Sequence, residues 1–193
     1  MTGFLSRITV LLICAAALTA TSPLTAQEGG WKEVKRQEKR EAIDAKADES
    51  LKALFDKSVK AKELYEASYG WAGFDNLKLA VGISGGGGQG VAVAKESGER
   101  AYMNMGSAGV GFSLGGQRYT VVFLFQDSKS FRHFVDSGWQ ADASASAVAG
   151  TDGANAQTGF VNGLAIYPMT DEGLMLAADI AGTKYWKDKK LNN

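Results

Sequence analysis

The sequence predicts an α+β fold in which a long N-terminal helix packs on a strongly curved, mostly antiparallel, glycine-rich sheet. Residues 31–68 contain neither glycine nor proline and are rich in Ala, Glu, Lys and Leu, which are good helix formers. From Gly70 onward the chain holds most of its 24 glycines, and the period of the apolar residues becomes two. These observations predict a helix followed by seven or eight short strands, with one short helix inserted among them.

The first 26 residues have the features of a secretory signal peptide. One positive charge, Arg7, precedes the apolar run ITVLLICAAALTA, and Leu24-Thr25-Ala26 forms a small-residue cleavage site. A membrane-spanning helix needs roughly 20 residues, so the short run favours a cleaved leader over the alternative, an uncleaved anchor. We therefore expect a periplasmic or secreted protein that associates peripherally with a membrane.

The cysteine content supports no thiol chemistry after export. Cys14 is the single cysteine of the chain, and it lies inside the predicted leader. A lipoprotein site would need a small residue before the cysteine, whereas Ile13 stands there. Cleavage after Ala26 would leave no cysteine and no disulfide.

The predicted helix has two parts of different character. Residues 27–47 form a charged extension, and the single domain of 48–193 begins with an amphipathic half. In that half an apolar stripe recurs near the helical period and should pack on a core, through Leu51, Leu54, Phe55, Val59 and Tyr65.

Six cations gather on one side of the extension. At 100° per residue they fall within an arc of about 140°, with the carboxylates on the other side. They are Lys32, Lys35, Arg36, Lys39, Arg40 and Lys46. Two interpretations stay open, a solvated helical extension and a basic face that lies against an anionic surface.

Five segments before residue 127 are predicted as strands, because their apolar residues alternate and glycine or polar turns separate them. They are residues 77–84, 90–95, 100–105, 108–114 and 117–126. The last has a continuous apolar centre, VVFLF, which predicts a strand buried on both faces.

A short helix and further strands follow. Asp127 should cap a helix at SKSFRHFVDSG, with Phe131, Phe134 and Val135 on its apolar face and Gly138 at its end. Residues 139–150 alternate alanine with other residues, which predicts a strand with an all-alanine face. TGFVNGLAIY and GLMLAADIAG are predicted as two more strands, joined by the turn PMTDEG.

The stretch GISGGGGQGVAVA, residues 82–94, contains the GxGxxG spacing of dinucleotide-binding loops. Such a loop must follow a strand and open a helix. VAVAK and Gly98 leave no room for that helix, and Val91 and Ala92 stand where a phosphate-binding loop needs Lys and Ser or Thr. We interpret the run as a glycine-rich hairpin or bulge between two strands.

No catalytic constellation is evident, and neither a cofactor nor a metal is expected. His133 is the single histidine and lies on the predicted short helix, which argues against a zinc site. No nucleophile elbow accompanies it to form a Ser-His-Asp triad. Asp171-Glu172 falls in a predicted turn and is interpreted as solvated. A small hydrolase with an unrecognised carboxylate pair stays an alternative.

The order of the sequence motifs along the chain resembles that of a known family. It runs from SYGWAGF through KLAVGISGGGGQGVAV, SAGVGFSLGGQ and YTVVFLFQD to ADASASAVAG and GLAIYPMTDEGLMLAADIAGTKYW. This order resembles the SYLF domain, a lipid-binding family that includes yeast and animal actin-patch regulators and many exported bacterial proteins. The resemblance covers about residues 48–186 and depends on the succession of glycine-rich strands rather than on one motif.

The resemblance implies a non-enzymatic module that binds membrane lipid. Eukaryotic members bind phosphoinositides, some bind actin filaments, and an SH3 domain is often attached. This sequence shows no SH3-like extension, and its predicted export would separate it from cytoplasmic actin. We therefore expect an anionic phospholipid of an envelope membrane as the partner, and not actin.

The residues themselves offer two candidate lipid-binding surfaces. Aromatic side chains favour a membrane interface, and each Lys or Arg near an anionic membrane contributes about 1 kcal/mol. The first surface is the basic face of the extension, with Lys32, Lys35, Arg36, Lys39 and Arg40 beside Trp31. The second is the C-terminal TKYWKDKK, with Tyr185, Trp186, Lys187, Lys189 and Lys190. A frayed C-terminus is the alternative interpretation of the second.

The charge distribution is compatible with a membrane but not with nucleic acid. The net charge is zero, so the broad basic field of a nucleic-acid-binding protein is absent. The leading hypothesis is an exported SYLF-type protein that binds anionic phospholipid. The alternative is an envelope structural protein that binds another protein through its helix or a sheet edge.

Overall fold

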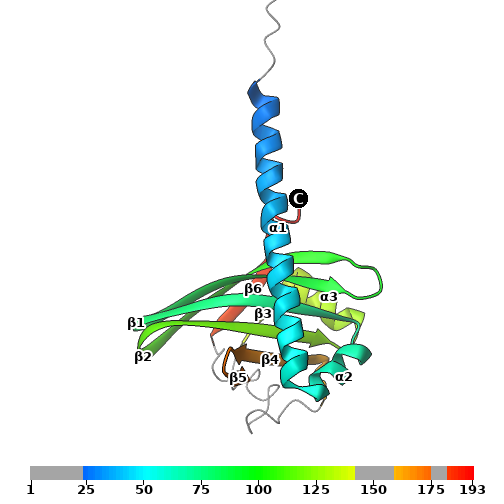
Figure 1. The fold of residues 1–193 in the computed structure, drawn as a ribbon, viewed down its shortest axis with the longest axis vertical. Helices are drawn as coiled ribbons and strands as arrows, with labels where there is room; N and C mark the ends of the chain where they lie inside the picture. Colours follow the sequence, from blue (N-terminus) through cyan, green and yellow to red (C-terminus); the bar gives the residue numbers. More distant parts are fainter. Residues whose placement is uncertain (1–23, 142–158, 175–181) are drawn as a thin grey trace, which may run out of the picture.

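The fold is known from a computed structural model that describes residues 24–141, 159–174 and 182–193 (Figure 1). Within those residues one long helix crosses one face of a curved antiparallel sheet, and a short helix lies on the other face. The predicted α+β class is therefore confirmed. The elements are α1 (Leu24–Lys57), α2 (Val59–Ala67), β1 (Gly70–Ala94), β2 (Arg100–Phe125), α3 (Ser128–Ser137), β3 (Trp139–Gln140), β4 (Leu164–Thr170), β5 (Gly173–Leu174) and β6 (Thr183–Lys187).

The single helix predicted for 31–68 is two helices, because Ser58 interrupts it. Ser58 has extended backbone angles, and its hydroxyl accepts a hydrogen bond from the backbone N–H of Ala61 at 3.1 Å. Serine thereby caps α2 instead of continuing α1. α1 itself begins at Leu24, so it runs across both the expected cleavage site and the expected boundary at residue 47. Those two boundaries stay predictions.

The strands predicted between 77 and 126 are segments of two long strands, so their predicted boundaries were wrong. β1 and β2 pair without a break in the antiparallel sense, from Gly70 opposite Phe125 to Val93 opposite Arg100, apart from one register shift between Val81 and Ile83. Glycine did not end the strands here, because a partner strand pairs along the whole run. The hairpin interpretation of Gly85–Gly88 was therefore wrong, although the register shift lies just before it.

The β1–β2 ribbon folds back on itself, so that the two halves of β1 lie side by side (Figure 1). A Cβ atom at Gly86 would lie 2.8 Å from the carbonyl oxygen of Leu77, and one at Gly90 would overlap that of Gly73. The N–H of Lys95 donates to the carbonyl of Tyr69 at 3.1 Å, where the two halves end. Glycine is therefore needed at 86, 88 and 90, where one half of β1 meets the other.

The remaining strands extend the sheet at both sides. Among the described residues the order is β3-β6-β2-β4-β5, with β1 paired to β2. β6 was not predicted, because TKYWK was interpreted as part of an exposed tail, yet it pairs with β2 from Met103 to Ser107. Most of the alanine-alternating segment and of GLMLAADIAG lies outside the described residues.

Two apolar clusters hold the sheet between the helices. On the α3 side, aromatic rings pack edge to face, with the ring centroids of Phe74 and Tyr185 4.7 Å apart. On the α1 side, Leu51 and Leu54 pack against the sheet, with Ala47 close to Gly73. Two predictions are confirmed here: the centre of β2 is buried on both faces, and Asp127 caps α3, whose apolar face is buried.

We predict that Gly90→Ala destabilises the fold by about 1–3 kcal/mol, because a methyl group there must displace the backbone of Gly73. Gly87→Ala is the matched control. Its Cβ would have no neighbour nearer than the carbonyl oxygen of Met105 at 3.8 Å, so its unfolding free energy should change by less than about 0.5 kcal/mol. Urea unfolding of both variants checks this, and equal losses would contradict the role assigned to the fold-back.

Candidate functional site

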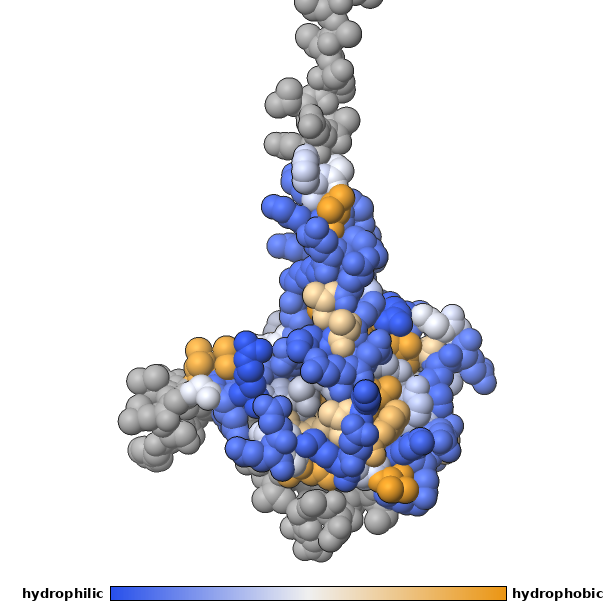
Figure 2. All heavy atoms as spheres, in the orientation of Figure 1, coloured by the Kyte–Doolittle hydropathy of each residue, from blue (hydrophilic) through white to orange (hydrophobic). Residues whose placement is uncertain are grey.

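The first half of α1 projects beyond the sheet as a stalk, which we define as residues 30–42 (Figure 1). From residue 30 onward, Ile43 is the first α1 residue that is buried. Before it the surface is mainly hydrophilic (Figure 2), with exposed apolar side chains at Trp31 (64% exposed) and Val34 (50% exposed). The predicted basic face lies on this stalk.

The five predicted cations of the stalk differ in their surroundings. Lys32, Lys35 and Lys39 are exposed. Arg36 is paired with Glu33, whose pKa is lowered chiefly by the hydrogen bond that Arg36 donates. Arg40 also reaches Glu33, at 3.2 Å, but it belongs to a larger structural contact. The three lysines are the exposed cations of the predicted face, so a large external partner can reach them.

Arg40 joins the stalk to the C-terminal segment. Its Nε donates to the carbonyl oxygen of Leu191 at 2.9 Å, and its terminal nitrogen donates to Asn193 at 3.2 Å. The guanidinium also lies over the ring of Tyr102, 5.9 Å from the centroid. Because the Arg40 side chain is only 19% exposed, we assign it to docking of the chain end rather than to ligand contact.

The C-terminal segment is docked, so the frayed-tail interpretation was wrong. Leu191 is buried, and the side chain of Asn192 bonds the backbone of Tyr102 in both directions, accepting from its N–H at 3.0 Å and donating to its carbonyl at 2.7 Å. These contacts resemble one more rung of a β-ladder. They hold the last residues against β2 and α1.

The aromatic pair of the second candidate surface is divided between the two faces of the sheet. Tyr185 is fully buried in the α3-side cluster, where burial raises the pKa of its hydroxyl, so it cannot contact a membrane as predicted. Trp186 points to the opposite face, as strand alternation requires, and packs on Gly106 while 42% exposed. Lys187 lies 3.9 Å from a carboxylate oxygen of Asp136, while Lys189 and Lys190 are exposed.

The structure does not merge the two candidate surfaces. The C-terminal segment docks on the side of α1 that carries Arg40 and Asp44, where Asp44 pairs with Arg100 at 2.9 Å. Lys39 lies about 100° around the helix from Arg40, and Lys35 lies farther from it still. The C-terminal segment therefore contacts the predicted basic face through Arg40.

The three stalk lysines continue into a longer row that the sequence did not single out. At 100° per residue, five lysines of α1 fall within an arc of about 60°, and the carboxylates of residues 30–57 fall outside that arc. We call this row the lysine stripe; it comprises Lys32, Lys35, Lys39, Lys46 and Lys57. Lys57 was missed because its half of the helix was expected only to pack on the core.

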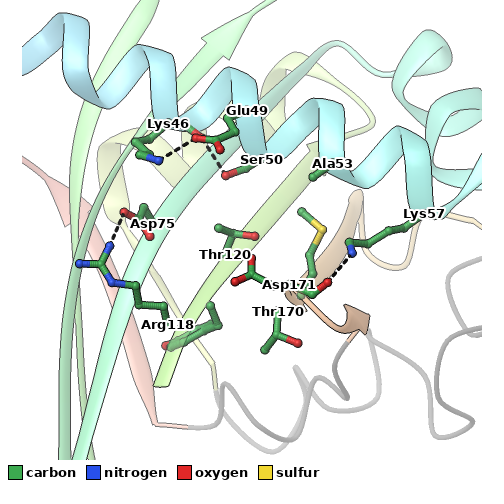
Figure 3. Close-up of a pocket in the computed structure, with 12 residues that line it drawn as sticks. Lys46, Glu49, Ser50, Ala53, Lys57, Asp75, Arg118, Thr120, Thr170 and Asp171 are labelled. Carbon is green, nitrogen blue, oxygen red and sulfur yellow. Dashed lines mark hydrogen bonds and ion pairs between the residues drawn. The ribbon is translucent and has the colours of Figure 1, made fainter. Parts of the chain in front are cut away.

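Where the lysine stripe passes the sheet, a pocket of about 360 Å³ opens between α1, β2 and β4 (Figure 3). Lys46 is paired with Glu49 at 2.7 Å, which raises the pKa of the lysine and lowers that of the glutamate. Three cations and three carboxylates line the pocket: Lys46, Lys57, Arg118, Glu49, Asp75 and Asp171. We call it the α1–β2 pocket. Of these residues, the sequence placed Lys46 in the basic arc and Asp171 in a solvated turn. It did not indicate a binding role for the others.

A second hollow, of about 340 Å³, lies beside α3. His133, Trp139 and Asn162 are among its lining residues. His133 is exposed on α3, and within the described residues no three His, Cys, Asp or Glu side chains are grouped to hold a metal ion. Among the described helices none has both the length and the apolar character needed to cross a membrane.

Comparison with known proteins supports the predicted resemblance. Residues 106–193 match the family model Ysc84, described as "Las17-binding protein actin regulator". The protein called "Beta cell expansion factor A" in Aeromonas veronii is 40% identical over 155 residues, which are 80% of this chain and 59% of that protein. Over residues 106–193, somewhat less than half of its length, the chain is similar to the Ysc84 (SYLF) family. The SYLF resemblance is thus confirmed.

The SYLF match covers only part of the molecule. It begins within β2 and includes α3 and the strands after it, whereas α1 and β1 precede it. The chain spans about three-fifths of the length of the Aeromonas relative. SYLF is a family of binding domains, and the matched residues do not include the stalk.

We predict that Arg40→Ala lowers the unfolding free energy by about 2 kcal/mol, because it leaves two carbonyl groups of the C-terminal segment without their charged donor. Carboxypeptidase should then remove the last residues faster. Lys39→Ala is the control, since it removes the same charge from a neighbouring exposed position and should cost less than about 0.5 kcal/mol. Equal behaviour of the two variants would remove Arg40 from this docking role.

Proposed function

We propose that the protein is exported and binds anionic phospholipid membranes through the lysine stripe of α1, without catalysing a reaction. The observation that carries the proposal is the alignment of five lysines on one side of a helix that projects from the body. The SYLF family supports lipid as the class of ligand.

The lysines of the stalk suit contact with an anionic membrane surface. Each lysine near an anionic membrane contributes about 1 kcal/mol, and this attraction falls off within a Debye length. Trp31 lies about 40° around the helix from Lys35, so its indole could enter the interfacial region beside the lysines. Electrostatic attraction would then dominate, because exposed apolar side chains are few along the stalk.

The alternative is an envelope protein that binds another protein through the stalk. The exposed Trp31 and Val34 could contribute to such an interface. The lysine stripe favours lipid, because a row of like charges suits a continuous anionic surface and needs no matching pattern of partner residues. The two functions are separated by the dependence of binding on lipid charge.

We predict that replacing Lys32, Lys35 and Lys39 together with glutamine weakens binding to phosphatidylglycerol-containing vesicles by about two orders of magnitude at low salt. The control replaces Lys52, Lys62 and Lys129, exposed lysines outside the stripe, and keeps the same net charge. Vesicle co-sedimentation at low and high salt measures both. Similar losses in the two triple variants would reject the stripe, and no binding of the unchanged protein would favour the protein-partner alternative.

We predict that cells exporting the protein process it after Ala26, so that the recovered chain begins at Gln27. Intact-mass measurement of the periplasmic and culture fractions checks this. The control inserts arginines into the apolar run before Thr19, which should retain the full chain in the cytoplasm. A full-length chain in the membrane fraction would support the uncleaved anchor instead.

A further inference from the structure

The α1–β2 pocket has a charge pattern that an anion alone does not match. Its lining contains as many carboxylates as cations, so a ligand that carries only negative charge would be repelled by Asp75 and Asp171 while it was attracted by Arg118 and Lys57. The hydroxyls of Thr120 and Thr170 add neutral hydrogen-bonding groups. A group that combines an anion with a hydrogen-bond-donating cation fits this lining better.

Two of the cations keep donors for a ligand. Arg118 is 76% exposed, and its guanidinium lies 3.9 Å from the Asp75 carboxylate, beyond an ordinary hydrogen bond. Lys57 donates to the backbone carbonyl oxygen of Asp171 at 3.1 Å, and that partner is neutral. Lys46 differs, because Glu49 already holds it at 2.7 Å.

The pocket lies on the side of α1 that the proposed function places against a membrane. Lys46 and Lys57 belong both to the lysine stripe and to the pocket lining, so a surface that lies along the stripe would pass over the pocket. Phospholipid head groups project from such a surface. The pocket is therefore placed to receive one head group while the stalk lysines meet the surrounding anionic lipid.

We propose that the α1–β2 pocket binds a phosphodiester that bears a primary ammonium group, the chemistry of a phosphoethanolamine head group. Its phosphate would accept hydrogen bonds from Arg118 and Lys57, since guanidinium groups suit phosphate oxygens. Its ammonium would donate to the carboxylates of Asp75 and Asp171. A choline head group has no N–H to donate, so the pocket should discriminate against it. This inference uses the membrane of the proposed function.

The first arm of the test uses vesicles. We expect the protein to bind vesicles of phosphatidylglycerol and phosphatidylethanolamine about tenfold more tightly than vesicles of phosphatidylglycerol and phosphatidylcholine in the same ratio. Arg118→Gln and Asp171→Asn should each abolish this preference. Arg132→Gln on α3 and Glu172→Gln in the same turn as Asp171 are matched controls and should retain it, with melting temperatures confirming that all four variants fold.

The second arm separates a lipid head group from a free phosphate compound. Titration of the protein with sn-glycero-3-phosphoethanolamine (a soluble phosphodiester), inorganic phosphate and ethanolamine, followed by NMR, should show shifts at Arg118 and Asp171 with the phosphodiester at the lowest concentration. Equal binding of inorganic phosphate would overturn the proposal in favour of a simple anion site. Equal binding of both vesicle types would also overturn it, and the proposed function would stand if the stalk variant still lost binding.

The two proposals fail differently. If the protein bound no vesicle but sn-glycero-3-phosphoethanolamine still shifted the pocket resonances, the membrane function would be rejected and the pocket chemistry would stand. If vesicle binding depended on the stalk lysines but ignored Arg118 and Asp171, the pocket proposal alone would be rejected.

Discussion

The fold depends on one close approach, that of the two halves of β1. A side chain at Gly90 would overlap the backbone of Gly73, so only glycine lets the ribbon fold back this tightly. The fold-back brings distant parts of β1 and β2 into one curved sheet with two apolar faces. One face holds the aromatic cluster under α3, and the other receives α1, where the small residues Ala47 and Gly73 let helix and sheet come close.

α1 has two roles because it is longer than the sheet it crosses. From Ile43 onward its apolar side chains are held by the core, and before that point it is a projecting stalk. The docked C-terminal segment supports the junction through Arg40, which turns a predicted ligand residue into a structural one. The stalk is thereby held at a defined angle, so its lysines face one direction as a set and not as independent charges.

The two proposed contacts with lipid use different physics. The stalk lysines offer a long-range attraction that depends on salt and hardly on head-group identity. The α1–β2 pocket offers short-range hydrogen bonds from balanced charges, which contribute little to attraction at a distance but can distinguish one head group from another. Such a protein would be attracted to an anionic membrane by its lysines and would then bind one kind of head group there through hydrogen bonds.

The sequence by itself determined the helical character of residues 31–68, the α+β class, the capped α3 and the buried centre of β2, because these follow from local propensity and the spacing of apolar residues. The SYLF relationship was also readable from the order of its motifs. The tertiary structure alone decided that the glycine run is a strand, that Tyr185 is buried and that Arg40 docks the chain end. It also decided the α1–β2 pocket, since Lys57, Arg118 and Asp171 come from α1, β2 and the turn between β4 and β5. Contacts between residues far apart in the chain leave no periodic signal, and only the folded backbone brings them together.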